Sequence, residues 1–258
     1  MKDPIIVIGL GELGSVFARG FLKTGHPVFP VTRDMDIQSA EQSYPNPKAV
    51  LVAVGEADIS TVLTNCPDAW KDKLILLQNE LLPRDWIAAN IIQPTVISVW
   101  FEKKKGMDSK VVLPSPIFGP NDRLLFDALA SLDIPSFLLD SEEELNYELV
   151  RKNLYILTTN IAGLEVGGNV EALMNEHAPV MNAVANDVLE VQDWLTGETN
   201  DNERLMSGLI EAINGDLAHG CMGRSAPSRL KRAIGFADEA GLEITTLREI
   251  AHKHLNPS

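Results

Sequence analysis

The N-terminal segment constrains the fold more strongly than any other part of the sequence. The β-branched run Ile5-Ile6-Val7-Ile8 has the composition of a buried strand, and Gly9-Leu10-Gly11-Glu12-Leu13-Gly14 follows it at once. Apolar residues then recur at helical spacing from Leu13 to Phe21, and Gly25 is placed to end that helix. A G-x-G-x-x-G motif between a strand and a helix is typical of the turn that binds the diphosphate of a dinucleotide.

Each glycine of this motif has its own expected task. Gly9 permits the tight exit from the strand, Gly11 lets a diphosphate approach the backbone, and Gly14 lets helix and strand pack closely. The N–H groups at the start of the helix would then face the phosphates. The residues predicted to bind the cofactor here are Gly9, Leu10, Gly11, Glu12, Leu13 and Gly14. The alternative is a glycine-rich turn that holds no ligand.

Charge and cysteine content argue against several classes of partner and site. The formal net charge is −14, which argues against nucleic acid or an anionic membrane as the main partner. Cys66 and Cys221 are too few for a disulfide framework or a zinc site, so no metal centre is predicted. Neither a signal peptide nor an apolar run of membrane-spanning length is recognisable, and the expected location is cytoplasmic.

Strand and helix patterns alternate through the first half of the chain. Strands are predicted at 5–8, 28–31, 49–54, 74–77, 96–101, 110–113 and 137–139, with a short helix after the third. Pro30 places the second strand at an edge or gives it an irregular end. This alternation indicates an α/β fold with a doubly wound, parallel Rossmann sheet.

The pattern becomes helical near Ser141, which forms a predicted capping box with Glu144. Helices are predicted at 141–164, 176–195, 201–217, 228–240 and 246–254, and no strand is predicted after Leu139. We therefore predict a dinucleotide-binding domain over residues 1–140 and an all-helical C-terminal domain over residues 141–258. The cleft between two such domains is the expected ligand site.

Arg33 and Asp34 follow the second predicted strand, where this fold meets the adenosine ribose of a dinucleotide. An arginine there accommodates the 2′-phosphate of NADP, whereas an acid accepts a hydrogen bond from the 2′-hydroxyl of NAD. Arg33 therefore predicts NADP as the cofactor, and Asp34 leaves NAD open. The remaining alternative is a solvated surface arginine.

Polar or small residues also follow the third and fourth predicted strands. Gly55 is a candidate for cofactor contact, or it is only a turn glycine. The carboxamide of Asn79, next to Gln78, offers both a donor and an acceptor for a nicotinamide or a substrate oxygen. A turn or a helix cap explains this pair equally well.

Lys152 and Asn160 lie near one face of the first C-terminal helix, at helical spacing from Leu149 and Ile156. A partly buried lysine has a lowered pKa and can deliver a proton near neutral pH. From spacing alone we expect the commoner arrangement, in which the lysine extends its ammonium group to solvent.

Taken together, these residues resemble the ketopantoate reductase (2-dehydropantoate 2-reductase) family of the 6-phosphogluconate-dehydrogenase-like, NAD(P)-binding proteins. The resemblance rests on Gly9–Gly14, Arg33, Gln78-Asn79, Arg151-Lys152-Asn153-Leu154 with Asn160, and the tail from Arg232 to Leu247. It implies an NADP-dependent oxidoreductase that reduces a carbonyl of a small, carboxylate-bearing molecule. It also implies that Lys152 is the catalytic acid and that Asn79 positions the nicotinamide or the carbonyl. Asn160 and Asn214 are then the implied substrate-binding residues.

The sequence differs from the family pattern near the expected substrate. Glu80 stands where the family has a glycine, Ile156 where it has an asparagine, and Ala226, after Ser225, where it has a glutamate. Three alternatives stay open: an imine reductase of the pyrroline-carboxylate-reductase type, a prephenate-dehydrogenase-like enzyme, and a non-catalytic NADP(H)-binding or sensing protein. The expected partner is a small-molecule substrate, with a homodimer left open and neither nucleic acid nor a membrane expected.

Overall fold

The computed structural model describes residues 2–255. The chain divides into two compact units, and the boundary falls between Leu149 and Val150, inside helix α6 (Glu142–Val166). The boundary predicted at 140/141 lies at the start of this helix. Each unit is described separately below.

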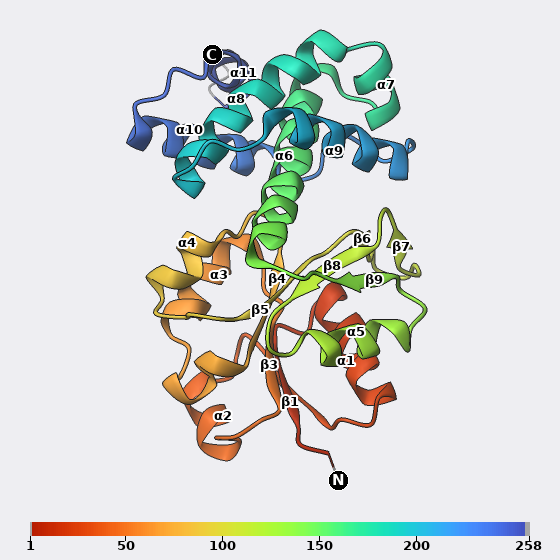
Figure 1. Cartoon of the computed structure of the whole chain (residues 1–258), viewed down its shortest axis with the longest axis vertical. Helices are drawn as coiled ribbons and strands as arrows, with labels where there is room; N and C mark the ends of the chain where they lie inside the picture. The colour runs from red at the N-terminus through yellow and green to blue at the C-terminus, as the bar shows by residue number, and fades with distance from the viewer. Residues whose placement is uncertain (1, 256–258) are drawn as a thin grey trace. The chain divides into compact units, whose positions relative to one another are not determined.

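The first unit is built on a seven-stranded sheet in the order β2-β1-β3-β4-β5-β8-β9 (Figure 1). Its strands are β1 (Ile5–Ile8), β2 (Val28–Val31), β3 (Ala49–Val52), β4 (Leu74–Gln78), β5 (Thr95–Ser98), β8 (Ser115–Phe118) and β9 (Ser136–Leu138). The first five strands in this order, β2, β1, β3, β4 and β5, are parallel to one another. The order of the strands reverses between β1 and β3, and in such sheets ligands bind at the carboxyl ends of the strands beside that reversal.

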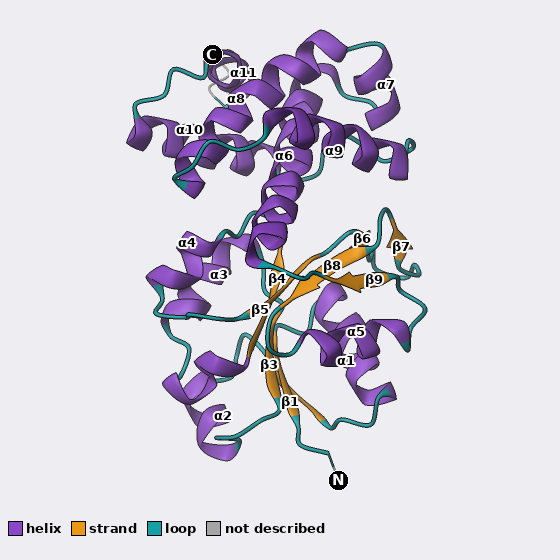
Figure 2. Ribbon diagram, viewed as in Figure 1, coloured by secondary structure: helices purple, strands orange, loops and turns teal. Residues whose placement is uncertain are grey.

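Helices cover both faces of the sheet, as the doubly wound prediction requires (Figure 2). One face is covered by α1 (Glu12–Lys23) and α5 (Asp122–Ala130), and the other by α2 (Ile37–Ser43), α3 (Glu56–Thr64) and α4 (Pro83–Ala88). Strand β1 is completely buried between these layers, consistent with its continuous apolar sequence. A Cβ at Gly20 would lie 2.6 Å from the carbonyl oxygen of Ala128, so this glycine permits the close contact of α1 with α5.

The sheet is not parallel throughout, which refines the predicted fold. β8 pairs antiparallel with β5, and β9 is parallel to β8. The sequence pattern missed β8 because it contains Pro116, and proline is depleted in interior strands. It also missed the short helices α2, α4 and α5.

The predicted strand 96–101 is in fact two strands in different sheets. β5 ends at Ser98, and the backbone N–H of Trp100 donates to Oγ of Ser115 at 2.9 Å. The chain then enters β6 (Phe101–Glu102), which pairs antiparallel with β7 (Lys110–Val111) in a two-stranded sheet. The predicted strands 49–54 and 110–113 are likewise too long at their C-terminal ends.

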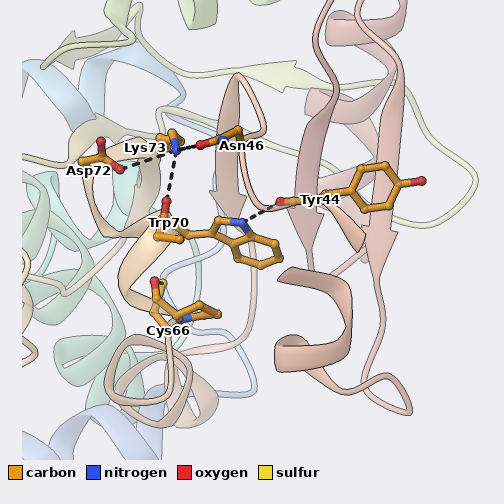
Figure 3. Close-up of polar contacts among 8 residues, drawn as sticks. Tyr44, Asn46, Cys66, Trp70, Asp72 and Lys73 are labelled. Carbon is orange, nitrogen blue, oxygen red and sulfur yellow. Dashed lines mark hydrogen bonds and ion pairs between the residues drawn. The ribbon is translucent and has the colours of Figure 1, made fainter. Parts of the chain in front are cut away.

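A 3₁₀ helix that was not predicted, η1 (Asp68–Lys73), is anchored beside β3 and β4 by the fully buried Trp70 (Figure 3). The indole Nε1 of Trp70 donates to the backbone oxygen of Tyr44 at 3.0 Å. Nζ of Lys73 donates to Oδ1 of Asn46 at 3.3 Å. These bonds fix the loop that leads into β3, and therefore the start of a strand whose other end meets the expected ligand site.

The second unit is helical. It comprises the greater part of α6, followed by α7 (Val170–Asn175), α8 (Ala178–Thr196), α9 (Asn202–Gly215), α10 (Ala226–Ala240) and α11 (Thr245–His254). Among the described residues no strand follows β9, apart from an isolated bridge between Asn169 and Gly220. All five predicted helices correspond to described helices, α6, α8, α9, α10 and α11, within two residues at each end, and α7 was not predicted.

The start of α6 shows why its N-terminus could be predicted. Oγ of Ser141 accepts from the backbone N–H of Glu144 at 3.2 Å. The carboxylate of Glu144 accepts in return from the backbone N–H of Asp140 at 2.8 Å, one residue earlier than a standard capping box. The two bonds satisfy donors that the first turn of a helix otherwise leaves without partners.

Candidate functional site

The glycine motif forms a close-packed turn with one open face. Gly9 has φ +88°, and a Cβ there would lie 2.5 Å from the backbone oxygen of Ala53. A Cβ at Gly14 would lie 2.0 Å from the backbone oxygen of Gly9, so α1 packs directly on the turn. A Cβ at Gly11, the residue that caps α1, would meet nothing within 4 Å. The turn therefore excludes side chains on its packed side and leaves space at the start of α1.

A cavity of about 700 Å³ opens at this turn, at the carboxyl ends of β1, β2 and β3. It is lined by Ile8, Gly9, Leu10, Gly11, Val31, Thr32, Arg33, Met35, Asp36, Ile37, Ala53, Val54, Gly55, Asp58, Thr61, Val62 and Asn65. Of the nine residues predicted to bind the cofactor, Gly9, Leu10, Gly11, Arg33 and Gly55 line this cavity, whereas Glu12, Leu13, Gly14 and Asn79 are not among its lining residues. Its place at the reversal of strand order is where doubly wound folds bind dinucleotides.

Arg33 lines the cavity but is held by an acid from a different element. Its Nη2 donates to Oδ2 of Asp58, in the first turn of α3, at 3.2 Å. Both side chains are solvent-accessible, at 89% for Arg33 and 51% for Asp58. Asp34 is exposed and is not part of the lining, whereas Asp36 is. Hydrogen bonds from Ser39, whose backbone N–H lies 2.9 Å from Oδ2 of Asp36, hold the pKa of that carboxyl below its usual value.

Asn79 lies beside this cavity, at the end of the neighbouring strand β4. With Leu13 it lines a smaller cavity of about 50 Å³, which shares Ala53 and Val54 with the larger one. The preceding residue, Gln78, is buried, and its Nε2 donates to the backbone oxygen of Asn79 at 2.8 Å. The carboxamide of Gln78 therefore holds the turn that presents Asn79.

The start of α1 carries an ion pair that ties it to the β6–β7 hairpin. Nζ of Lys103 lies 3.4 Å from Oε2 of Glu12. The ring of Phe101 packs on that of Phe17 in α1, with the ring centroids 5.9 Å apart. The hairpin is thus fixed against α1, and Lys103 compensates the acidic side chain that follows Gly11.

Lys152 is buried in the second unit, at 7% exposure, so the expectation that it reaches solvent is wrong. The reason is that every residue of α6 from Val150 to Tyr155 is buried, so the helix has no exposed face there along which the lysine could reach solvent. Nζ of Lys152 lies 5.9 Å from the ring centroid of Tyr155. Burial, together with the positive charges of Arg229 and Arg151, lowers the pKa of Lys152 to about 7. The side chain can therefore both hold and release a proton at neutral pH.

The charged neighbours of Lys152 differ in their own pairing. Nη2 of Arg151 lies 3.0 Å from Oε2 of Glu211, which offsets much of its charge. Nη1 of Arg229, on α10, donates to Oδ1 of Asn160 at 2.9 Å. Glu148, one helical turn before Lys152, is also buried. Arg229 is thus in contact with a predicted substrate-binding residue and electrostatically coupled to the predicted acid.

Two other positions from the sequence analysis lie elsewhere in the second unit. Asn214 is exposed in the last turn of α9. Ala226 is completely buried at the first residue of α10. Ala226 therefore contributes no acid at the place where the resembled family has a glutamate.

Comparison with solved structures finds the same fold. A 2-dehydropantoate 2-reductase from Porphyromonas gingivalis W83 matches with a TM-score of 0.68 and 11% identity, over 99% of this chain and 100% of that one. The corresponding protein of Methylococcus capsulatus gives 0.65 and 13%, over 96% and 94%. A D-mandelate dehydrogenase in complex with NADH gives 0.67 and 13%, over 98% of each chain.

The resemblance to ketopantoate reductases is thus confirmed at the level of the fold. So is the predicted fold class, a Rossmann sheet followed by helices. No family model and no curated protein sequence matches the chain.

The residues present fit a dinucleotide. The turn excludes side chains on its packed side, has open space at the start of α1, and borders a cavity large enough for an extended ligand. Within residues 2–255, no group of three or more His, Cys, Asp or Glu side chains is arranged to hold a metal ion. None of the helices described there is long and apolar enough to cross a membrane.

Sequence reasoning missed the contribution of α3 to the cavity. Asp58, Thr61, Val62 and Asn65 all line it, and their spacing of three, four and seven residues places them on one face of that helix. In the sequence, only the apolar positions of this segment indicate a helix, and they do not show which face meets the cavity. It also missed Arg229, because the sequence contains no signal that α10 packs beside α6.

Proposed function

We propose that this protein is a carbonyl reductase that uses a nicotinamide dinucleotide, NADP with NAD also accepted, and acts on a small, carboxylate-bearing substrate. The observation that carries the proposal is the buried Lys152, with its pKa near 7, in a chain that also has the glycine-lined cavity. A buried lysine with a strongly lowered pKa is a common feature of functional sites. The fold, shared with ketopantoate reductases and D-mandelate dehydrogenase, supports the same reaction class.

The proposed roles follow from the chemistry of each group. The glycine-lined cavity would hold the dinucleotide, whose nicotinamide would supply the hydride for the carbonyl carbon. Lys152 donates a proton to the carbonyl oxygen as negative charge develops there. Asn79 orients the nicotinamide or the carbonyl, and Asn160 binds the polar end of the substrate.

The second unit also carries groups suited to a substrate carboxylate. Arg229 fixes Oδ1 of Asn160, so Nδ2 of Asn160 is the atom that donates to a substrate oxygen. Asn214 is a further proposed substrate contact. The positive charges of Lys152 and Arg229 favour an anionic substrate, although the chain as a whole carries a net charge of −14.

The test is a screen for oxidation of NADPH and of NADH over 2-oxo acids, aldehydes and cyclic imines. On the best substrate, Lys152→Ala should lower turnover by about 10²–10⁴-fold and leave NADPH binding nearly unchanged. Lys152→Arg should restore little, because a guanidinium holds its proton too strongly. Lys231→Ala, at an exposed lysine of α10, is the matched control and should have wild-type turnover. Equal turnover of Lys152→Ala and wild type on a 2-oxo acid would contradict the assignment.

The second candidate is a protein that binds the dinucleotide without turnover. The completely buried Ala226 favours it, since no carboxylate is present there to assist Lys152. This candidate predicts tight NADPH binding and no oxidation in the whole screen. An imine reductase predicts turnover only with cyclic imines, at a rate that Lys152→Ala does not change.

A further inference from the structure

The end of the large cavity that faces the predicted adenosine ribose has an unexpected charge balance. Arg33 is the one cation among its described lining residues, and Asp36 and Asp58 are the two anions. An NADP 2′-phosphate brings about two negative charges, so a site selective for NADP needs net positive charge around it. Here the lining has one positive and two negative side chains.

The two acids are not equivalent. The carboxylate of Asp36 caps α2, where the backbone N–H and hydroxyl of Ser39 donate to it at 2.9 Å and 2.8 Å. Asp58 instead uses its carboxylate to accept from the guanidinium of Arg33 at 3.2 Å. Asp58 therefore competes for the group that a 2′-phosphate requires.

The Arg33–Asp58 pair is open to solvent, which matters for its strength. With 89% of the Arg33 side chain and 51% of the Asp58 side chain exposed, the pair is weak and can separate when a ligand binds. A 2′-phosphate that took Arg33 would then face an adjacent carboxylate. A 2′-hydroxyl would find in the same carboxylate a hydrogen-bond acceptor.

We propose that Asp58 is a specificity-determining residue, which weakens the preference for NADP that Arg33 creates and allows the protein to use both NADP and NAD. This inference rests on the proposed dinucleotide site, and it assigns the acid at the ribose end to α3. The sequence had instead suggested Asp34, which is not part of the cavity lining.

Binding measurements test the inference without any substrate. Dissociation constants for NADPH and NADH are measured by titration calorimetry for wild type, Asp58→Asn, Arg33→Ala and the double variant. In Asp58→Asn the ratio of NADPH to NADH affinity should rise about fivefold, the size expected when one exposed charge interaction is removed. The increase should shrink at high salt, because exposed charges are screened. In the Arg33→Ala background the gain should be smaller, since no guanidinium is released.

Asp34→Asn is the matched control, because it removes the same charge from an exposed residue next to Arg33, in the turn after β2 and outside the cavity lining. Its affinity ratio should stay at the wild-type value. Melting curves establish that each variant folds, since Asp58 also lies in the first turn of α3, where acids stabilise a helix.

Two outcomes would overturn the inference. If Asp58→Asn weakened NADPH binding, Asp58 would be a positioning residue that orients Arg33 for the phosphate. If it changed both affinities equally, Asp58 would play no part in discrimination. Failure of the proposed function itself has a different signature, in which wild type binds neither dinucleotide.

Discussion

Nη1 of Arg229 donates to Oδ1 of Asn160 at 2.9 Å and so joins α10 to the helix that carries Lys152. Arg229 is thus hydrogen-bonded to one predicted substrate-contacting residue of α6, Asn160, and electrostatically coupled to the other, Lys152. The positive charge of Arg229 also opposes protonation of Lys152. It is the second largest cause of the lowered pKa of Lys152, after burial. The two effects can be separated experimentally.

Arg229→Gln should move the alkaline limb of the pH profile to higher pH. Loss of a nearby positive charge raises the pKa of Lys152 above its value of about 7, so the acid form persists further into the alkaline range. The measurement is kcat against pH on the substrate found in the screen. Arg224→Gln, at an exposed arginine just before α10, should leave the limb in place. If the alkaline limb of Arg229→Gln moved to lower pH or did not move, the electrostatic effect of Arg229 on Lys152 would be contradicted.

Lys152→Met should stabilise the fold, most of all at acidic to neutral pH. The lysine has an ordinary pKa of 10.5 in the unfolded chain and about 7 in the folded one, so between these values the unfolded chain binds more protons. Wild-type stability from this group is therefore lowest below pH 7 and rises as the pH approaches 10.5. Urea unfolding at about pH 6 and about pH 9 measures the difference, with Lys231→Met as the control. If the difference in unfolding free energy between Lys152→Met and wild type were larger at about pH 9 than at about pH 6, the lowered pKa of Lys152 would be refuted.

Gly14→Ala should impair folding, whereas Gly11→Ala should impair cofactor binding. A Cβ at Gly14 would lie 2.0 Å from the backbone oxygen of Gly9, so the variant should lose at least about 1–3 kcal/mol of stability, the usual cost of overpacking. A Cβ at Gly11 meets nothing within 4 Å, so Gly11→Ala should fold normally and bind NADPH more weakly. Thermal unfolding and NADPH titration give the two readouts. Wild-type NADPH affinity in Gly11→Ala would place the diphosphate elsewhere.

Both cysteines should resist thiol reagents while the protein is folded. Burial raises the pKa of Cys66 and of Cys221 to about 11, so little thiolate exists near pH 8. Ellman's reagent should therefore label neither residue in the native protein and both in urea. Rapid labelling of one native thiol would show that its surroundings open readily.

The parts of the fold that could be predicted are those with local signals. The strand before Gly9 has continuous β-branched residues, and the start of α6 has a Ser141–Glu144 pair that makes the predicted bond. The strand β8 gave no such signal because Pro116 interrupts its pattern. Its antiparallel direction depends on long-range pairing with β5, which no local pattern encodes.

The residues of the candidate site also separate into those that a local sequence signal predicts and those that depend on long-range packing. Gly9, Gly11 and Arg33 follow strands directly, so chain order alone places them at one edge of the sheet. Asp58 and Arg229 come from helices whose packing partners cannot be read from spacing. The burial of Lys152 was missed for a related reason, since a helix surrounded by other helices offers no route to solvent.

Pro30 lies in β2, the outermost strand of the sheet next to β1. A proline has no N–H to donate, so this edge is a poor template for an added strand. The opposite edge, β9, is only three residues long. Two copies of the chain are therefore disfavoured from joining their sheets edge to edge, and intermolecular strand pairing of the folded state, the usual first step of β-type aggregation, is suppressed at both ends.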